Sequence, residues 1–435
     1  MNFFTGFCER HRPRVLFVAP AMPAANGNGL AMRMGMFLEA YANLGEVHCL
    51  IVPLTGSAIA NAFCTRHARR LEVIGVAGRA ETPFALLAAV ADSRERVAAF
   101  RRYGQPSLAA FLSTPVREEI RKRVQAHSYD IVHISRAYLA PLAGLIASLY
   151  PRARIILDLD EDEPSTRRSL ARLYRQNGDF ANAEWQEAEA AAYQRLITAV
   201  LPAIHLSIVS SPNEGNRAFA SDPSRSPIAI VPNAVAIPAM PPKSTLSRGL
   251  IFVGSFGYFP NHDAALWIIR SIWPRIAKRC PQATLSLVGR RPNTTLRRVA
   301  RQPGVRLCAD VADVGVAYRS CSIALVPIRA GGGTRIKLLE AGAHALPCVS
   351  TSVGAEGLIL GGLAMADDSE RFADMCVEFL RSPALRLHMG LCLRSFVQRH
   401  HDRGSIIRLI SQLVSTLYDG AGAARAFAEP EKANV

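Results

Sequence analysis

The stretch "GGGTRIKLLEAGAHALP" (residues 331–347) joins three consecutive glycines to a segment with the apolar pattern of a helix. A glycine loop before a helix N-terminus is a typical anion site, because free N–H groups and the helix dipole favour negative charge. Thr334 adds a hydroxyl, while Arg335 and Lys337 add cations suited to phosphate oxygens. Glu340 follows, where a carboxylate suits the vicinal hydroxyls of a ribose. The stretch therefore predicts a nucleotide diphosphate site.

A flexible glycine turn before an amphipathic surface helix would give the same composition, so that alternative stays open at this point. The stretch is not a P-loop, because the order GxxxxGK[ST] is missing. The following "HALPCVSTSVGAEGL" (344–358) adds a second glycine turn after an apolar segment, which favours the nucleotide site.

Outward from this stretch, short apolar runs alternate with amphipathic stretches, a pattern typical of parallel βαβ units. Long helices are expected at residues 179–197, 262–279 and 404–420. The expected strands are residues 14–20, 46–54, 130–135, 154–160, 206–211, 228–235, 250–256, 283–289, 305–311, 322–328 and 347–351.

A proline-rich link, "AIPAMPPKSTLSRG" (236–249), interrupts this series, and the pattern then restarts. A chain of 435 residues is also too long for one ordinary core. We therefore expect an α/β fold of two Rossmann-like parallel-sheet domains, with a ligand between them at the carboxyl ends of both sheets. The expected parts are residues 1–240, residues 241–400, and residues 401–435 as a helix returning to the first domain plus a tail.

Residues 331–358 resemble the nucleotide-sugar-binding signature of the family 4 glycosyltransferases, which have the GT-B fold. The segments "RVLFVAPAMPAANGNG", "YDIVHIS", "IVPNAVAIP" and "LIFVGSFGYFPNHDAALW" agree in order. The resemblance implies two Rossmann-like domains facing a central cleft. It also implies a retaining, metal-independent transfer of a sugar from a nucleotide-diphosphate sugar to a glycan or lipid-linked acceptor, without a cofactor. The donor would bind the C-terminal domain and the acceptor mostly the N-terminal one.

By this resemblance, Glu340 is the ribose-binding glutamate, the second of two in the signature. Gly332 stands where the first is expected, so the glutamate that normally helps to hold the donor sugar is absent. We expect Arg335 and Lys337 to neutralise the diphosphate and so to be catalytic, with His133 contacting the sugar. The predicted donor-binding residues are Gly27, Asn28, Gly29, Gly254, Ser255, Phe256, Gly331, Gly332, Gly333, Thr334 and Glu340.

Two of these expectations have plain structural alternatives. Gly27 to Gly29 would equally suit an ordinary turn between a strand and a helix, and His133 could be a packed strand histidine. Ser135 is an alternative sugar contact at the same strand end.

Five carboxylates in "LDLDEDEP" (157–164) follow an apolar strand. Asp158 and Asp160 have the DxD spacing with which GT-A glycosyltransferases hold a divalent cation. The restart of the strand series after residue 250 disfavours that single-domain fold. We therefore expect no metal site, and predict Asp160, Asp162 and Ser135 as acceptor-side residues.

The net charge of +16 favours anionic partners. Basic stretches at residues 64–70, 94–104 and 117–124 suit either solvated helix faces or a membrane surface, and they carry no recognised nucleic-acid motif. Nine scattered cysteines indicate reduced thiols, and no apolar run reaches the ~18 to 20 residues of a membrane span. We expect a cytoplasmic protein, peripheral at the inner face of the cell membrane, with no nucleic-acid partner.

Two functions of different class follow. The first is a glycosyltransferase of polysaccharide, exopolysaccharide or cell-envelope synthesis, a process suggested by family analogy. The second is a non-catalytic nucleotide-sugar-binding or partner subunit of GT-B fold, favoured by Gly332. A dinucleotide oxidoreductase is disfavoured because neither glycine loop gives GxGxxG.

Overall fold

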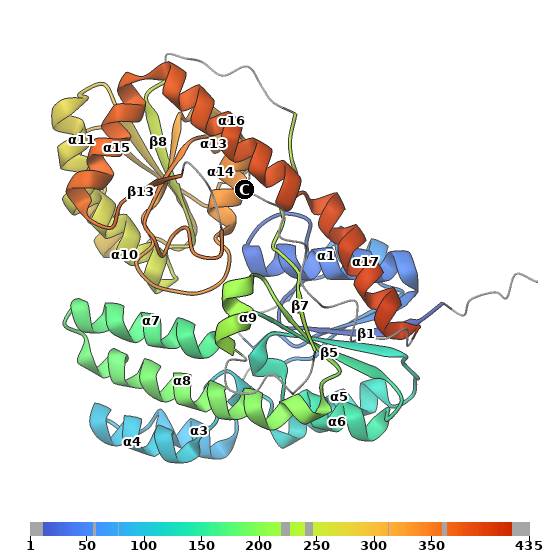
Figure 1. Ribbon diagram of the computed structural model, residues 1–435. Coiled ribbons are helices and arrows are strands. Elements are labelled where there is room, and N and C mark those ends of the chain that lie inside the picture. Colours follow the sequence, from blue (N-terminus) through green and yellow to red (C-terminus); the bar gives the residue numbers. More distant parts are fainter. Residues whose placement is uncertain are drawn as a thin grey trace, which may run out of the picture.

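The computed structural model describes residues 12–54, 58–76, 78–218, 227–239, 247–311, 313–358 and 363–419. Within these residues the chain forms two parallel sheets with helices packed against them (Figure 1). The N-terminal sheet has the order β3-β2-β1-β4-β5-β6-β7, and the C-terminal sheet has the order β10-β9-β8-β11-β12-β13. Two Rossmann-like domains are thus confirmed. The predicted boundary between residues 240 and 241 lies outside the described residues.

The described residues contain thirteen short strands, separated along the chain by helices. The strands are β1 Arg14–Ala19, β2 Glu46–Ile51, β3 Arg70–Val73, β4 Ile131–Ser135, β5 Arg154–Asp160, β6 Leu206–Val209, β7 Ile228–Ile230, β8 Gly249–Val253, β9 Thr284–Gly289, β10 Val305–Ala309, β11 Ile323–Val326, β12 Cys348–Ser350 and β13 Ala364–Met365.

Helices of the N-terminal domain are α1 Gly29–Leu44, α2 Ala62–His67, α3 Thr82–Leu87, α4 Ser93–Tyr103, α5 Thr114–Val124, α6 Leu142–Leu149, α7 Glu163–Gln176, α8 Phe180–Val200 and α9 Pro212–Ala218. Those that follow are α10 Phe259–Trp267, α11 Trp273–Arg279, α12 Thr294–Val299, α13 Val314–Ser320, α14 Ile336–Ala343, α15 Ser369–Arg381, α16 Pro383–His400 and α17 Arg403–Tyr418.

The eleven expected strands are all present, and the sheets also contain β3 and β13 at their edges. The sequence did not indicate β3, because it is only four residues long and alternates charged with apolar residues, none of them buried. The single helix expected at residues 262–279 is divided into α10, a π-helical turn at Ile268–Ile272, and α11. Pro274 explains the division, since it has no N–H to donate to the preceding turn.

The chain segments that cross between the domains lie side by side. Val235, after β7, donates its N–H to the His401 carbonyl at 3.0 Å, and Arg403 returns an N–H to Val235 at 3.1 Å. Beyond this bridge α17 packs on α1 (Figure 1). Ile410 and Val414 of α17 are fully buried in the core of the N-terminal domain. The last helix therefore anchors the C-terminal end of the described chain to the first domain.

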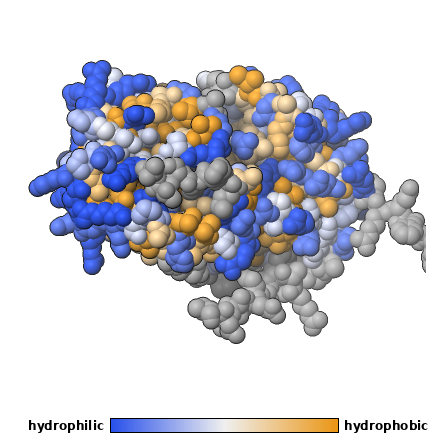
Figure 2. Space-filling model, turned by 90° about the horizontal axis from the view of Figure 1, so that it is seen from above, coloured by the Kyte–Doolittle hydropathy of each residue, from blue (hydrophilic) through white to orange (hydrophobic). Residues whose placement is uncertain are grey.

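Among the described helices, none is both long and apolar enough to cross a bilayer. On the face seen from above, hydrophobic residues lie in patches between hydrophilic ones (Figure 2). The basic stretches of the sequence fall on α2 with β3, on α4 and on α5.

Candidate functional site

The glycine loop Gly331–Gly333 leads into α14 at the carboxyl end of β11. Gly331 and Gly333 have φ angles of 120° and 71°, which side chains other than glycine rarely adopt. Gly332 does not. Instead, a Cβ atom at Gly332 would lie 1.9 Å from Thr166 Oγ1 and 2.8 Å from Glu161 Oε2. Two glycines are therefore required by backbone conformation, and the third by the close approach of the N-terminal domain.

The N-terminal domain also binds the backbone of this loop. The Gly331 N–H donates to Ser169 Oγ at 3.2 Å, and the Gly333 N–H donates to Glu214 Oε1 at 3.0 Å. The other oxygen of Glu214 accepts the N–H of Asp162. In this conformation a carboxylate and a hydroxyl hold donors that we expected to point freely outward. An anion that binds these N–H groups has to replace those oxygens.

Arg335, immediately before α14, retains an unused donor beside the loop. Its Nη1 donates to the Gly332 carbonyl and its Nε to the Val353 carbonyl at 3.4 Å. Its Nη2 is buried and has no hydrogen-bond partner among the described residues. The guanidinium lies near Gly331 and the Tyr258 hydroxyl. A half-buried cation with an unused N–H suits an anionic ligand, because charge-assisted hydrogen bonds are the strong ones.

Lys337 and Glu340 lie three residues apart on α14, on one face of the helix. Lys337 Nζ donates to Asn261 Oδ1 at 2.6 Å and lies 5.0 Å from the Phe252 ring centroid. Burial, together with nearby Arg335, lowers the pKa of Lys337 to about 7. Burial also raises the pKa of Glu340 to about 7, although Tyr318 donates to Oε2 at 3.3 Å. Both groups therefore titrate near neutrality.

These pKa values predict a bell-shaped pH dependence of nucleoside diphosphate binding. Below pH 7, Glu340 protonates and no longer accepts two ribose hydroxyls; above pH 7, Lys337 must take up a proton to pair with phosphate. Affinity should therefore peak near pH 7 and fall up to about tenfold per pH unit on each side. Calorimetric titration between pH 5.5 and 8.5 measures this.

Two variants test whether Lys337 causes the alkaline limb of that pH profile and Glu340 the acidic limb. Lys337→Arg should flatten the alkaline limb, because a guanidinium stays charged throughout. Glu340→Gln should flatten the acidic limb. A native profile without a maximum, or limbs unchanged in both variants, would contradict the assignment.

The glycine turn of the N-terminal domain meets the start of α14. Gly27 has a φ of 117°, and Asn28 Oδ1 caps α1 by accepting the Ala31 N–H at 2.9 Å. A Cβ atom at Gly29 would lie 2.9 Å from Ile336 Cγ1. The structure thus brings the two predicted glycine loops together, with Asn28 engaged as a helix cap.

The predicted donor residues after β8 are linked to the site by Asn261, which contacts Gly254 and Ser255 and also binds Lys337. A Cβ atom at Gly254 would lie 2.8 Å from Asn261 Cγ, and the Ser255 carbonyl accepts from Asn261 Nδ2 at 3.0 Å. The Phe256 side chain is buried in the core beside Phe252. Asn261, which also holds Lys337, was not among the predicted site residues.

His133 and Ser135 lie inside the N-terminal domain. His133 shares hydrogen bonds with the Tyr41 hydroxyl at 2.8 Å and with Ser135 Oγ at 3.1 Å, so both ring nitrogens are engaged. Both side chains are fully buried. Burial, and then Arg33, lowers the pKa of His133 well below its ordinary value, so the ring is neutral. This geometry favours the packed strand histidine over a sugar contact at His133, and it places Ser135 beside it in the same buried network.

The acidic end of β5 is bound by arginines. Arg33 Nη2 and Nε donate to Asp158 at 2.7 and 2.9 Å. Arg136 Nη1 donates to Asp160 at 2.9 Å, and Asn233 Nδ2 donates to its other oxygen at 3.0 Å. Within the described ranges no group of three or more His, Cys, Asp and Glu side chains is placed to hold a metal ion.

Asp162, the other predicted acceptor residue, is buried at the start of α7. Sequence reasoning missed Arg33 and Arg136. A signal for Arg33 exists in "LAMRMGMFL" (30–38), where one charge in an apolar helix indicates a buried partner.

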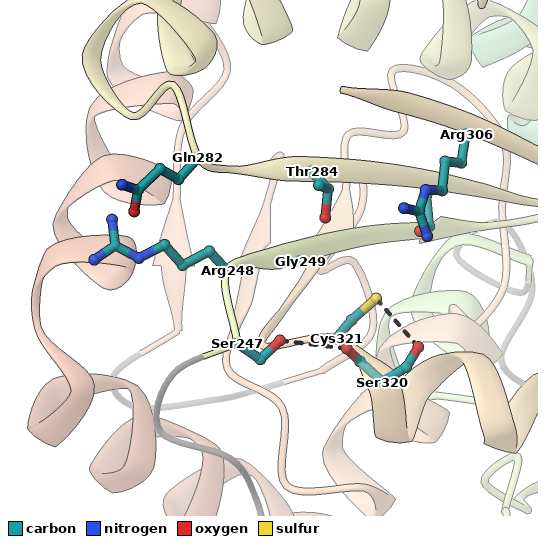
Figure 3. Close-up of a pocket in the computed structure, with 9 residues that line it drawn as sticks. Ser247, Arg248, Gly249, Gln282, Thr284, Arg306, Ser320 and Cys321 are labelled. Atoms are coloured by element: carbon teal, nitrogen blue, oxygen red, sulfur yellow. Dashed lines mark hydrogen bonds between the residues drawn. The ribbon is translucent and has the colours of Figure 1, made fainter. Parts of the chain in front are cut away.

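A pocket of about 400 Å³ lies at the amino ends of β8 and β9 in the C-terminal sheet (Figure 3). The glycine loop follows the carboxyl end of β11 in the same parallel sheet, so this pocket is separate from the glycine-loop site. Its lining residues include Arg248, Thr284, Arg306 and Ser320.

Comparisons with known proteins give a family match for part of the C-terminal domain. Residues 247–382 match the family model described as Glycosyl transferases group 1. A protein of Klebsiella pneumoniae, described as an uncharacterized protein in the cps region, is 22% identical over 173 residues. That match covers 37% of this chain and 44% of the relative, so the chain spans less than half of the curated relative's length.

Solved structures of the same fold cover almost the whole chain. HepE of Anabaena, in complex with UDP and glucose, has a TM-score of 0.62 at 14% identity, over 93% of this chain and all of the other. Sucrose-phosphate synthase of Thermosynechococcus elongatus has a TM-score of 0.65 at 15% identity, over 94% and 100%. These matches confirm the GT-B fold.

Proposed function

We propose that this protein is a member of the glycosyl transferases group 1 family, whose model matches residues 247–382, and that it transfers a sugar from a UDP-sugar to a glycan or lipid-linked acceptor. The observation that carries the proposal is the glycine loop at the start of α14, with the unused Nη2 donor of Arg335 beside it. Lys337 and Glu340 follow on the same helix. This arrangement suits a diphosphate followed by a ribose.

The chemistry that these residues support is transfer with retention and without a metal ion. The diphosphate would lie on the glycine loop between Arg335 and Lys337, and the ribose on Glu340. As the bond from the anomeric carbon to the diphosphate oxygen breaks, both cations stabilise the departing negative charge. The acceptor hydroxyl attacks from the same face, and the diphosphate takes its proton.

The process and the location that we propose follow from a relative and from the surface charge. The cps-region relative suggests polysaccharide synthesis. Exposed arginines of α4 and α5 suit an acceptor presented at an anionic membrane surface, at the inner face of the cell membrane.

A thermal-shift panel of UDP, GDP, ADP and their sugar conjugates, with and without magnesium, tests the proposal. A ligand at 100 times its Kd should stabilise the protein by about 2.7 kcal/mol. We expect a shift with UDP and UDP-sugars that magnesium leaves unchanged. Glu340→Ala should lower the affinity for UDP at least about tenfold, because the ribose loses its charged acceptor, and the thermal shift should shrink accordingly. The absence of a shift with every nucleotide would overturn the proposal.

A hydrolysis assay separates an enzyme from a binding subunit. Incubation with the UDP-sugar that gives the largest shift should release UDP slowly, since water can replace the acceptor. Binding without any release or transfer would favour the non-catalytic alternative. A shift that depends on magnesium would contradict the metal-independent mechanism.

A further inference from the structure

Besides Glu214, a second carboxylate of the N-terminal domain lies against the glycine loop. Glu161 follows β5 of the N-terminal domain, and its Oε2 lies 2.8 Å from the position that a Cβ atom of Gly332 would take. Its own Cβ lies 3.5 Å from the corresponding position at Gly333. Together with Thr166, whose Oγ1 lies 1.9 Å from the same position, Glu161 therefore fills the space into which a side chain at residue 332 would project.

Two donors hold this carboxylate in a fixed orientation. Arg136 Nη2 donates to Oε1 of Glu161, and Thr166 Oγ1 donates to Oε2 at 2.9 Å. An ionised carboxylate has about four acceptor positions, so about two remain for a ligand. Burial raises the pKa of Glu161 and Arg136 lowers it, with a net lowering, so the group stays ionised at neutral pH.

The backbone around Glu161 is strained. Asp160, directly before it, has a φ of 63°, and Arg136, which binds it, has a φ of 76°. Residues other than glycine adopt such angles at a cost of order 1 kcal/mol, and these positions concentrate at functional sites. At Asp160 the register of β5 with β6 also shifts. The strain accompanies the exit of Glu161 from the sheet toward the loop of the opposite domain.

The charged groups along the loop and α14 have a definite order. Glu161 lies at Gly332, Arg335 follows with its unused donor, and Glu340 is five residues further, about 7 to 8 Å along a helix. Carboxylate, cation and carboxylate are the complement of sugar hydroxyls, diphosphate and ribose hydroxyls. We propose that Glu161 accepts hydrogen bonds from hydroxyl groups of the transferred sugar and selects the donor by its sugar. This inference rests on the proposed function.

Placing this carboxylate on the N-terminal domain has a consequence for binding. The nucleotide part of the donor contacts α14 and its loop, all on the C-terminal domain. The sugar contact, in contrast, forms when the two domains approach each other as they do here. Glu161 should therefore affect the affinity for a UDP-sugar but not for UDP.

The test compares the Kd of UDP with that of a UDP-sugar by calorimetry. The UDP-sugar is whichever of UDP-glucose, UDP-galactose and UDP-N-acetylglucosamine stabilises the native protein most. In Glu161→Gln the affinity for this UDP-sugar should fall about 10- to 100-fold, because a hydrogen bond to a charged acceptor is lost. The affinity for UDP should stay within about twofold.

A second variant disturbs the contact between Glu161 and the glycine loop by changing the loop instead of the carboxylate. Gly332→Ala places a methyl group 1.9 Å from Thr166 Oγ1, which forces Thr166 and Glu161 away from the loop. Since the φ angle of Gly332 is not in the left-handed region, alanine suits the local backbone. This variant should reproduce the sugar-selective loss. The control is Glu163→Gln, which disturbs the same Arg136 network but removes no carboxylate from the loop.

The outcomes separate the two levels of proposal. A sugar-selective loss in Glu161→Gln and Gly332→Ala, absent from Glu163→Gln, supports the inference. Equal losses for UDP and the UDP-sugar, or no loss for either, would overturn it while the proposed function stands. If the native protein binds no nucleotide, the proposed function itself fails, and the inference fails with it.

Discussion

Replacing Arg335 and Lys337 together with alanine is expected to weaken UDP binding by at least about 100-fold. Each charge-assisted hydrogen bond to phosphate contributes about 1.5 to 3 kcal/mol, so two lost bonds amount to about 3 to 6 kcal/mol. Arg335 should carry the larger part, because it is always charged and has an unused donor, whereas the pKa of Lys337 is about 7. Calorimetric titration with UDP at pH 7 measures the loss.

The control for this experiment removes two cations that lie away from the site. Lys278 and Arg298 are exposed on the same domain, so the double alanine variant lowers the net charge equally. Its affinity for UDP should stay within about twofold, because exposed charges are screened by salt. Near-native affinity in the Arg335 and Lys337 double variant would show that the diphosphate binds elsewhere.

Replacing Arg33 with methionine is expected to lower the free energy of unfolding of the N-terminal domain by about 3 to 5 kcal/mol. Arg33 and Asp158 are 1% and 2% exposed and bonded at 2.7 Å. Arg33 Nη1 also donates to the carbonyl of Val231 at 3.0 Å and to Asn233 Oδ1 at 3.1 Å. Methionine keeps most of the volume but leaves Asp158 charged, buried and without this partner. Urea denaturation followed by circular dichroism measures the change.

Two further variants identify the cause of that loss. Adding Asp158→Leu to Arg33→Met should recover most of the stability, because no charge remains uncompensated. Arg175→Met breaks an ion pair of comparable length to Glu187, but at partly exposed side chains, and should cost less than about 1 kcal/mol. A loss below 1 kcal/mol in Arg33→Met would show that water reaches Asp158.

Glu214 and Ser169 link the N-terminal domain to the glycine loop of the C-terminal domain. Both belong to the N-terminal domain and bind N–H groups of the glycine loop, which are the donors that a diphosphate would use. A donor that binds these groups therefore displaces oxygens of the opposite domain. If the donor binds there as we propose, the relative position of the domains and the occupancy of the loop are coupled through Gly331 and Gly333.

The amino-acid sequence by itself determined the local features of this protein. Apolar runs of strand length predicted eleven of the thirteen described strands, including every interior strand of both sheets, because parallel strands covered by helices must be apolar throughout. It also located the glycine loop and the cations and carboxylate of α14, since these lie within ten residues of one another. The division of the helix at residues 262–279 could have been read from Pro274.

The tertiary structure decided which distant side chains meet. The sequence does not predict that Glu161 and Thr166 lie against Gly332, because these residues are far apart in the chain. For the same reason it does not predict that Arg33 is the partner of Asp158, 125 residues away. It equally hides that His133 and Ser135, at the end of a strand, bond to each other inside the domain. The physical reason is that a strand or helix pattern fixes which face of an element is buried, whereas the partner on that face depends on how the elements pack. The predicted site of the C-terminal domain is local in sequence, and the carboxylate that we place on the sugar is not.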